Sequence, residues 1–142
     1  IGYCCEVKSS IVGRDVWAHS SYIGDSIVDA NTAFGAGCVT GNLRLDEGEI
    51  LSTCDGSPLP TGLTKLGLIA GSGCRFGIHV SINPGVKVGR GCFLSGGITL
   101  TRDIPDESYV KADHPAAITI LPNRTRPPSP QARGLYRMGI TG

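Results

Sequence analysis

The sequence predicts an all-β fold in which a six-residue unit repeats along the chain. Glycine supplies 21 of the 142 residues, about twice its usual share. Residues 70–99 read as five consecutive hexads, AGSGCR, FGIHVS, INPGVK, VGRGCF and LSGGIT. Their first and fifth positions are apolar, and their second positions are small or turn-forming. This pattern predicts short strands stacked on one another and joined by tight corners.

The composition excludes several other classes of protein. Helical bundles and coiled coils need apolar residues at helical spacing, which the chain lacks. Hydrophobic residues make up 40% of the sequence, too many for a wholly disordered chain. The glycines do not recur at every third position, as collagen requires. A β-sandwich predicts turn signals about every 8–12 residues, so the hexads favour a coil.

Taken in order, the elements fit one interrupted coil. Residues 9–27 follow the hexad frame poorly, and the frame becomes clear at Val28 (VDANTA) and Phe34 (FGAGCV). Val28 and Ala70 differ in sequence number by 70 − 28 = 42, a multiple of six, so the phase survives an interruption. That interruption, residues 41–69, includes the turn-rich DGSPLPTG and predicts a long loop that leaves the coil and returns. We expect the coil to span residues 1–112.

The C-terminal extension, residues 113–142, has a different composition. It contains the Pro- and Arg-rich stretch PNRTRPPSPQARG, which admits a short helix only over residues 131–138. We expect the extension to pack on the coil or on a neighbouring subunit. Its arginines alternate little with aromatic residues, and the formal net charge is +1, so neither a nucleic acid nor a membrane is an expected partner.

The six cysteines indicate reduced thiols. None forms a CxxC pair, so a zinc or thioredoxin-like site is not indicated, although an even count keeps a secreted disulfide framework open. Cys38, Cys74 and Cys92 occupy inward hexad positions, where a thiol acts as a small hydrophobe. We therefore favour a cytoplasmic protein. No apolar run reaches the length of a membrane span. The chain begins in mid-pattern at Ile1, and we expect it to be a fragment of a longer protein.

Four segments add a closer resemblance. HSSYIGDSIV, FGAGCVTGNLRLD, TGLTKLGLIAG and VSINPGVKVG occur in that order. Together with the hexads they resemble the C-terminal, hexapeptide-repeat acetyltransferase domain of sugar-1-phosphate nucleotidylyltransferases. These include the bifunctional glucosamine-1-phosphate N-acetyltransferase/UDP-N-acetylglucosamine pyrophosphorylases. The resemblance covers roughly residues 3–112. It implies a left-handed parallel β-helix with three hexads per coil, a homotrimer, and acetyl-CoA as co-substrate.

The same resemblance assigns roles to individual residues. It makes His19 the general base, because a neutral imidazole can take the proton that an attacking amine loses. It makes Tyr22 and Asn42 contacts to a sugar phosphate, and it places the backbone of Ala36 against acetyl-CoA. Lys65 is a further basic candidate for the substrate. With three hexads per coil, Tyr22 lies opposite Thr40, so we expect His19, Tyr22 and Asn42 on one edge, where the loop departs.

Two departures from the family pattern favour an alternative function. Where bifunctional relatives carry lysines in the departing loop, this chain has Gly48 and Leu51. Residues 42–57 contain Arg44 against Asp46, Glu47, Glu49 and Asp55, a net charge of 1 − 4 = −3. Ala33 also stands where many relatives have asparagine. The alternative is a non-catalytic β-helix that trimerises or regulates a nucleotidylyltransferase.

A metal-dependent hexapeptide enzyme is a weaker alternative. A carbonic anhydrase of this fold needs three histidines on one ion. The sequence numbers of His19, His79 and His114 differ by 79 − 19 = 60 and 114 − 79 = 35. Neither difference is a multiple of three hexads, so we expect no metal site. An outward hexad position predicts that His79 is a surface residue.

Overall fold

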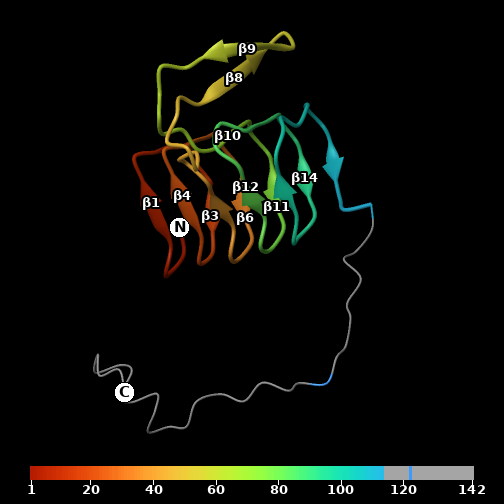
Figure 1. Cartoon of the computed structure of the whole chain (residues 1–142). Helices are drawn as coiled ribbons and strands as arrows, with labels where there is room; N and C mark the ends of the chain where they lie inside the picture. Colours follow the sequence, from red (N-terminus) through yellow and green to blue (C-terminus); the bar gives the residue numbers. More distant parts are fainter. Residues whose placement is uncertain (114–121, 123–142) are drawn as a thin grey trace, which may run out of the picture.

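A computed structural model describes residues 1–113 and 122, and it shows short parallel strands wound into a helix of coils (Figure 1). Three sheets form its sides. Face A contains β1 (Glu6–Lys8), β4 (Tyr22–Gly24), β7 (Val39–Thr40), β12 (Ser81–Ile82) and β15 (Thr99–Leu100). Face B contains β2 (Ile11–Val12), β5 (Ile27–Val28), β10 (Ile69–Ala70) and β13 (Lys87–Val88). Face C contains β3 (Trp17–Ala18), β6 (Ala33–Phe34), β11 (Arg75–Phe76), β14 (Phe93–Leu94) and β16 (Tyr109–Val110).

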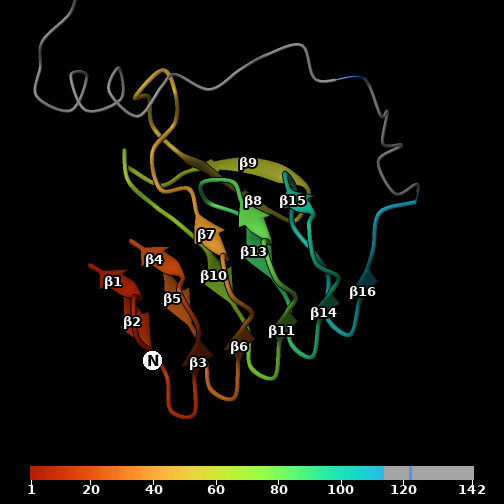
Figure 2. The same ribbon diagram turned by 90° about the horizontal axis from the view of Figure 1, so that it is seen from below.

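The predicted fold class, an all-β left-handed parallel β-helix, is confirmed. Within the described residues there is no helix, and therefore none that is long and apolar enough to cross a membrane. The chain visits faces A, B and C in turn, and successive coils lie side by side from β1 to β16 (Figure 2).

The core lies along the axis of the coils and follows the hexad frame. The first positions Phe76, Ile82, Val88 and Leu94 are at most 4% exposed. The fifth positions Cys74, Val80, Val86 and Cys92 are at most 5% exposed, and Ile98 is half-buried. Phe34 and Phe76 stack on neighbouring coils with their ring centroids 4.6 Å apart. Each coil therefore buries its inward residues against the next coil.

Glycines at the second hexad position allow the coils to approach closely. A Cβ atom on Gly77 would lie 2.5 Å from the backbone nitrogen of Gly96 on the next coil. Glycines at the fourth position have another role, because Gly97 has φ +73, in the left-handed region that side chains disfavour. The excess of glycine thus serves two separate corner positions.

The coils are not all three hexads long. In the C-terminal half Ile69 pairs with Lys87, and 87 − 69 = 18 is three full hexads. In the N-terminal half the steps are shorter, because Glu6 pairs with Tyr22 (22 − 6 = 16) and Tyr22 pairs with Val39 (39 − 22 = 17). The expectation that Tyr22 lies opposite Thr40 was therefore wrong by one residue. Some N-terminal corners are one residue shorter, which is why the hexad frame is weak over residues 9–27.

The interruption between β7 and β10 contains a β-hairpin rather than only an irregular loop. Strands β8 (Leu51–Cys54) and β9 (Ser57–Pro60) pair antiparallel, and they project from the coils in Figure 1. Asp55 and Gly56 both have positive φ, as a two-residue hairpin turn of type I′ requires. Prolines are tolerated because in a two-stranded ribbon both strands have a free edge. Lys87 holds the hairpin: its Nζ lies 2.6 Å from Thr53 O and 2.7 Å from Asp103 Oδ2.

Candidate functional site

Three polar side chains meet at the corner between faces A and B, where the chain leaves the coil. Tyr22 begins β4, Asp25 follows β4, and Asn42 follows β7. The Asn42 Nδ2 group donates to Asp25 Oδ2 at 2.6 Å and to the Tyr22 hydroxyl at 3.2 Å. Two of the residues predicted from the sequence, Tyr22 and Asn42, are therefore brought into direct contact.

Gly24 makes room for the ring of Tyr22. A Cβ atom on Gly24 would overlap the Tyr22 hydroxyl oxygen and lie 2.7 Å from the ring carbon that bears it. The tyrosine ring therefore lies across the glycine on the outer side of β4 and reaches toward Asn42. The closeness of Tyr22 and Gly24 explains how Tyr22, at the start of β4, contacts Asn42, beyond the end of β7.

Lys65 returns to the same corner at the far end of the interruption. Its backbone forms an isolated antiparallel bridge with Leu43, and the following residue, Leu66, donates its N–H to Asn42 O at 3.0 Å. The Lys65 side chain is exposed. The fold thus places an exposed lysine next to the Tyr22–Asn42 pair.

His19 and Ala36 lie at the neighbouring corner, between faces C and A. His19 follows β3, Ala36 follows β6, and both are exposed. Ser21 Oγ connects these two turns, because it lies 2.8 Å from His19 O and 3.3 Å from Gly35 O. Strand β4 separates His19 from the Asp25–Asn42 contact, so the expectation that His19 shares one edge with Tyr22 and Asn42 was wrong. Among the described residues, no hydrogen bond joins the His19 imidazole to Tyr22 or Asn42.

The departing segment remains acidic in the fold. Arg44 pairs with Asp46 at 2.6 Å, and the hydrogen bond from Arg44 lowers the pKa of Asp46 to about 2. The arginine charge is therefore offset by its nearest neighbour. Glu49 accepts a hydrogen bond from Gly62 N at 2.6 Å, while Glu47 and Asp55 are exposed.

The remaining candidates behave as structural residues. His79 is exposed with φ 55, and its backbone N–H donates to Ala36 O at 2.9 Å. Burial raises the pKa of the Cys38 and Cys74 thiols, and all six cysteines are free. In the described part of the chain, no three metal-binding side chains gather. His114 and the C-terminal extension beyond Asp113, with the segment 131–138, fall outside the described residues apart from Pro122.

Asp25 is the member of the cluster that sequence reasoning missed. A spacing of three hexads pairs Asn42 with Gly24, whereas the shorter coil aligns Asn42 with Asp25. The sequence feature that could have identified Asp25 is an aspartate at a corner position. Its φ is 49, a value that aspartate and asparagine tolerate better than most residues.

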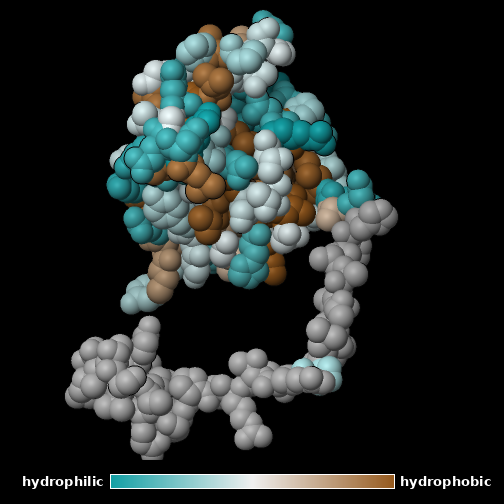
Figure 3. Space-filling view, viewed as in Figure 1, coloured by the Kyte–Doolittle hydropathy of each residue, from teal (hydrophilic) through white to brown (hydrophobic). Residues whose placement is uncertain are grey.

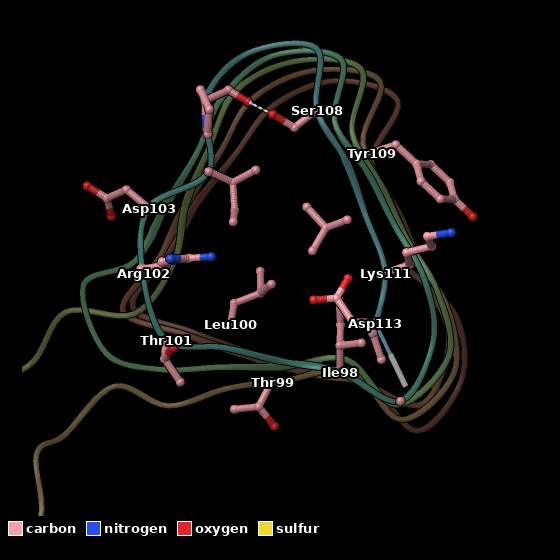
Figure 4. A pocket seen from close by; sticks show the side chains of 15 residues that line it. Ile98, Thr99, Leu100, Thr101, Arg102, Asp103, Ser108, Tyr109, Lys111 and Asp113 are labelled. Atoms are coloured by element: carbon pink, nitrogen blue, oxygen red, sulfur yellow. Dashed lines mark hydrogen bonds between the residues drawn. The ribbon is translucent and has the colours of Figure 1, made fainter. Parts of the chain in front are cut away.

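An open cavity lies elsewhere, at the C-terminal end of the coils (Figure 4). It is lined by the last turn of chain, where Ser108 Oγ donates to Pro105 O at 2.7 Å. On face A, β7 and β12 separate β4 from β15, so this cavity is distant from the Tyr22–Asn42 pair. It is the open end of the β-helix.

Comparisons with known proteins identify relatives over most of the chain. No protein-family model matches it. The bifunctional protein GlmU of Methanococcus maripaludis is 38% identical over 120 residues, 84% of this chain. The bifunctional sugar-1-phosphate nucleotidylyltransferase/acetyltransferase of Sulfurisphaera tokodaii is 40% identical over 113 residues, 78% of this chain. The chain spans only 29% and 28% of the lengths of these relatives, in their C-terminal part.

A solved structure supports the fold. The maltose O-acetyltransferase of Clostridium difficile 630 superposes with a TM-score of 0.51, covering 77% of this chain and 62% of its own, at 17% identity. At that identity the likeness concerns the fold alone. The sequence relatives are more specific, at 38% and 40% identity over 120 and 113 residues. The chain therefore belongs to the hexapeptide-repeat, left-handed β-helix domains found in the C-terminal part of bifunctional sugar-1-phosphate nucleotidylyltransferase/acetyltransferases.

Proposed function

We propose that this domain transfers an acetyl group from acetyl-CoA to the amine of an amino-sugar 1-phosphate, as part of a cytoplasmic sugar-phosphate nucleotidylyltransferase. One observation carries the proposal. The Tyr22–Asn42 hydrogen bond of 3.2 Å joins two residues that the family resemblance assigns to the sugar, in a chain 38% identical to a bifunctional relative.

The chemistry needs a base and a place for the developing oxyanion. The amine nitrogen attacks the thioester carbonyl carbon, the carbon–sulfur bond breaks, and the amine loses a proton that is finally carried by the departing thiol. His19 is the residue we assign to receive that proton. Its exposure on a corner leaves the imidazole accessible to a substrate. The Ala36 N–H would face the thioester, since the N–H groups of Gly35 and Gly37 donate to Phe76 O and Ser20 O.

Lys65 is our candidate for the sugar phosphate. The loop lysines of the family are absent at Gly48 and Leu51, and Arg44 is paired with Asp46. Lys65 is exposed beside Asn42, where its neighbour Leu66 hydrogen-bonds to the Asn42 carbonyl. A single ammonium group can attract a phosphate, although the acidic segment around it weakens that attraction.

We infer a homotrimer from the family resemblance, and an apolar ladder supports an assembly. Ile11, Ile27 and Ile69 occupy paired, outward positions on adjacent strands of face B, with Ile11 69% and Ile27 44% exposed. Hydrophobic patches lie on the outside of the coils in Figure 3. Ile27→Lys is expected to dissociate the assembly, measured by light scattering, while Thr99→Lys on face A should not. Dissociation by Thr99→Lys alone would place the interface elsewhere.

The proposed activity is tested by thiol release from acetyl-CoA. The wild-type chain should release CoA with glucosamine 1-phosphate and not without an amine acceptor, and Lys65→Met should raise the KM for the sugar phosphate. A matched substitution, Lys111→Met, changes an exposed lysine far along the coil and should leave the KM unchanged. The proposal is contradicted if CoA release does not depend on the acceptor at concentrations that saturate an active relative.

The acidic departing segment favours a second candidate, a non-catalytic β-helix that trimerises or regulates a nucleotidylyltransferase. Asp46, Glu47, Glu49 and Asp55 repel the phosphates of both substrates. This candidate predicts that the chain forms a trimer but binds neither acetyl-CoA nor glucosamine 1-phosphate in calorimetry. Binding of acetyl-CoA would exclude it.

A further inference from the structure

The polar cluster at the corner between faces A and B has a fixed donor and acceptor pattern. A carboxylate can only accept hydrogen bonds, so the Asn42 atom that lies 2.6 Å from Asp25 Oδ2 must be the amide nitrogen. The same nitrogen donates to the Tyr22 hydroxyl oxygen at 3.2 Å. Both hydrogens of the Asn42 amide are thereby used within the protein.

Two groups remain for a ligand. The Asn42 carbonyl oxygen, Oδ1, has no hydrogen-bond partner among the described residues, and the Tyr22 hydroxyl accepts from Asn42 without donating to any of them. Asn42 therefore offers an acceptor and Tyr22 offers a donor. Both side chains are only half-buried, so a substrate can reach them.

Asp25 is itself held firmly. Its backbone N–H donates to Lys8 O at 2.9 Å, and its carbonyl accepts from Gly67 N at 2.7 Å. Its φ of 49 puts it in the conformation for which other corners of this protein use glycine. A side chain at such a position has a conformational cost, which is smaller for aspartate than for most residues. The carboxylate at this corner accepts the 2.6 Å hydrogen bond from Asn42.

We propose that Asp25 is a positioning residue that locks the Asn42 amide, so that the site selects an acceptor with one hydrogen-bond donor and one acceptor group side by side. Neighbouring amine and hydroxyl groups on a sugar ring have this chemistry, with an N–H or O–H facing Asn42 Oδ1 and an oxygen facing the Tyr22 hydroxyl. The inference rests on the proposed function only for the identity of the acceptor. The locked amide is a property of the free protein.

The kinetic test is the isosteric change Asp25→Asn, which lets the Asn42 amide turn over and present either end. The KM for the acceptor should rise about tenfold, the loss expected for one misaligned hydrogen bond. The KM for acetyl-CoA and the melting temperature should change little. Asp15→Asn is the matched control, because Asp15 also has positive φ, 55, but lies on another corner. An unchanged acceptor KM in Asp25→Asn, or an equal rise in both KM values, would overturn the proposal.

A second readout is independent of turnover. In the wild-type chain, the two side-chain amide hydrogens of Asn42 should exchange slowly with solvent, and their NMR signals are identified by their loss in Asn42→Ala. Asp25→Asn should shift them and speed their exchange. If the signals behave as predicted and no acetyl transfer is found, the proposed function fails and the positioning role stands. If the wild-type hydrogens exchange with solvent as fast as those of an exposed asparagine side chain, the positioning role is wrong whatever the activity.

Discussion

The N-terminal and C-terminal coils share one fold but build their corners differently. In the C-terminal coils the left-handed corner position is mostly glycine, as at Gly91 and Gly97. These coils are three hexads long until the last, where Phe93 pairs with Tyr109 after 109 − 93 = 16 residues. In the N-terminal coils the equivalent positions hold Ser20, Asp25 and Asn31, and the coils are shorter by one or two residues. If the proposed function holds, the regular half is scaffold and the irregular half carries the polar side chains that meet the substrate.

Glycine at the second hexad position is the feature on which the regular half depends most, and it gives the largest expected effect. Gly77→Ala should destabilise the fold by about 3 kcal/mol, because its Cβ would collide with backbone of the next coil. Gly97→Ala, on the following coil, has nothing within 4 Å and should cost only about 1 kcal/mol for its positive φ. Urea denaturation measures both. Equal losses would mean that close approach of the coils does not limit this position.

The projecting hairpin depends on a contact with the regular half, which gives a smaller effect. Lys87→Met removes the ammonium contacts to Thr53 O and Ser52 Oγ and the half-exposed ion pair with Asp103. We expect a loss of about 1 kcal/mol and faster proteolytic cleavage within residues 51–60. Lys111→Met serves as the control. Unchanged cleavage in Lys87→Met would show that other contacts, such as those of the buried Ile50 side chain, hold the hairpin.

The smallest expected effect on stability comes from replacing the polar corner residues of the irregular half with glycine, at corners that no function uses. Asp15→Gly should change the free energy of unfolding by less than about 1 kcal/mol. Glycine removes the backbone strain at φ 55, but it also gives the unfolded chain more conformational freedom, and the two effects offset each other. The same change at Asp25 should be equally mild in thermal unfolding. A loss above that range at Asp15 would reveal a structural role for its carboxylate.

The periodic part of the fold was predictable because each hexad position requires one kind of residue for a simple physical reason. Phe76 and Val88 follow from apolar first positions, and Gly77 follows from the need for close approach. The hairpin was missed because Pro58 and Pro60 argue against strands, although the Asp55–Gly56 pair is a turn signal. Tyr22 and Asn42 were identified by resemblance. Asp25 was not identified, because its alignment with Asn42 depends on the number of residues in the N-terminal coil, which the sequence of a single hexad does not reveal.

The contrast between the two halves makes a direct prediction for their two exposed histidines. His19 lies in the irregular half and His79 in the regular half, both at corners between faces C and A. The decisive measurement is the kcat/KM for acetyl transfer to glucosamine 1-phosphate in His19→Ala and His79→Asn. We predict a loss of about 10²–10⁴-fold for His19→Ala, the range for removal of a general base, and near wild-type activity for His79→Asn. Full turnover in His19→Ala would contradict this assignment.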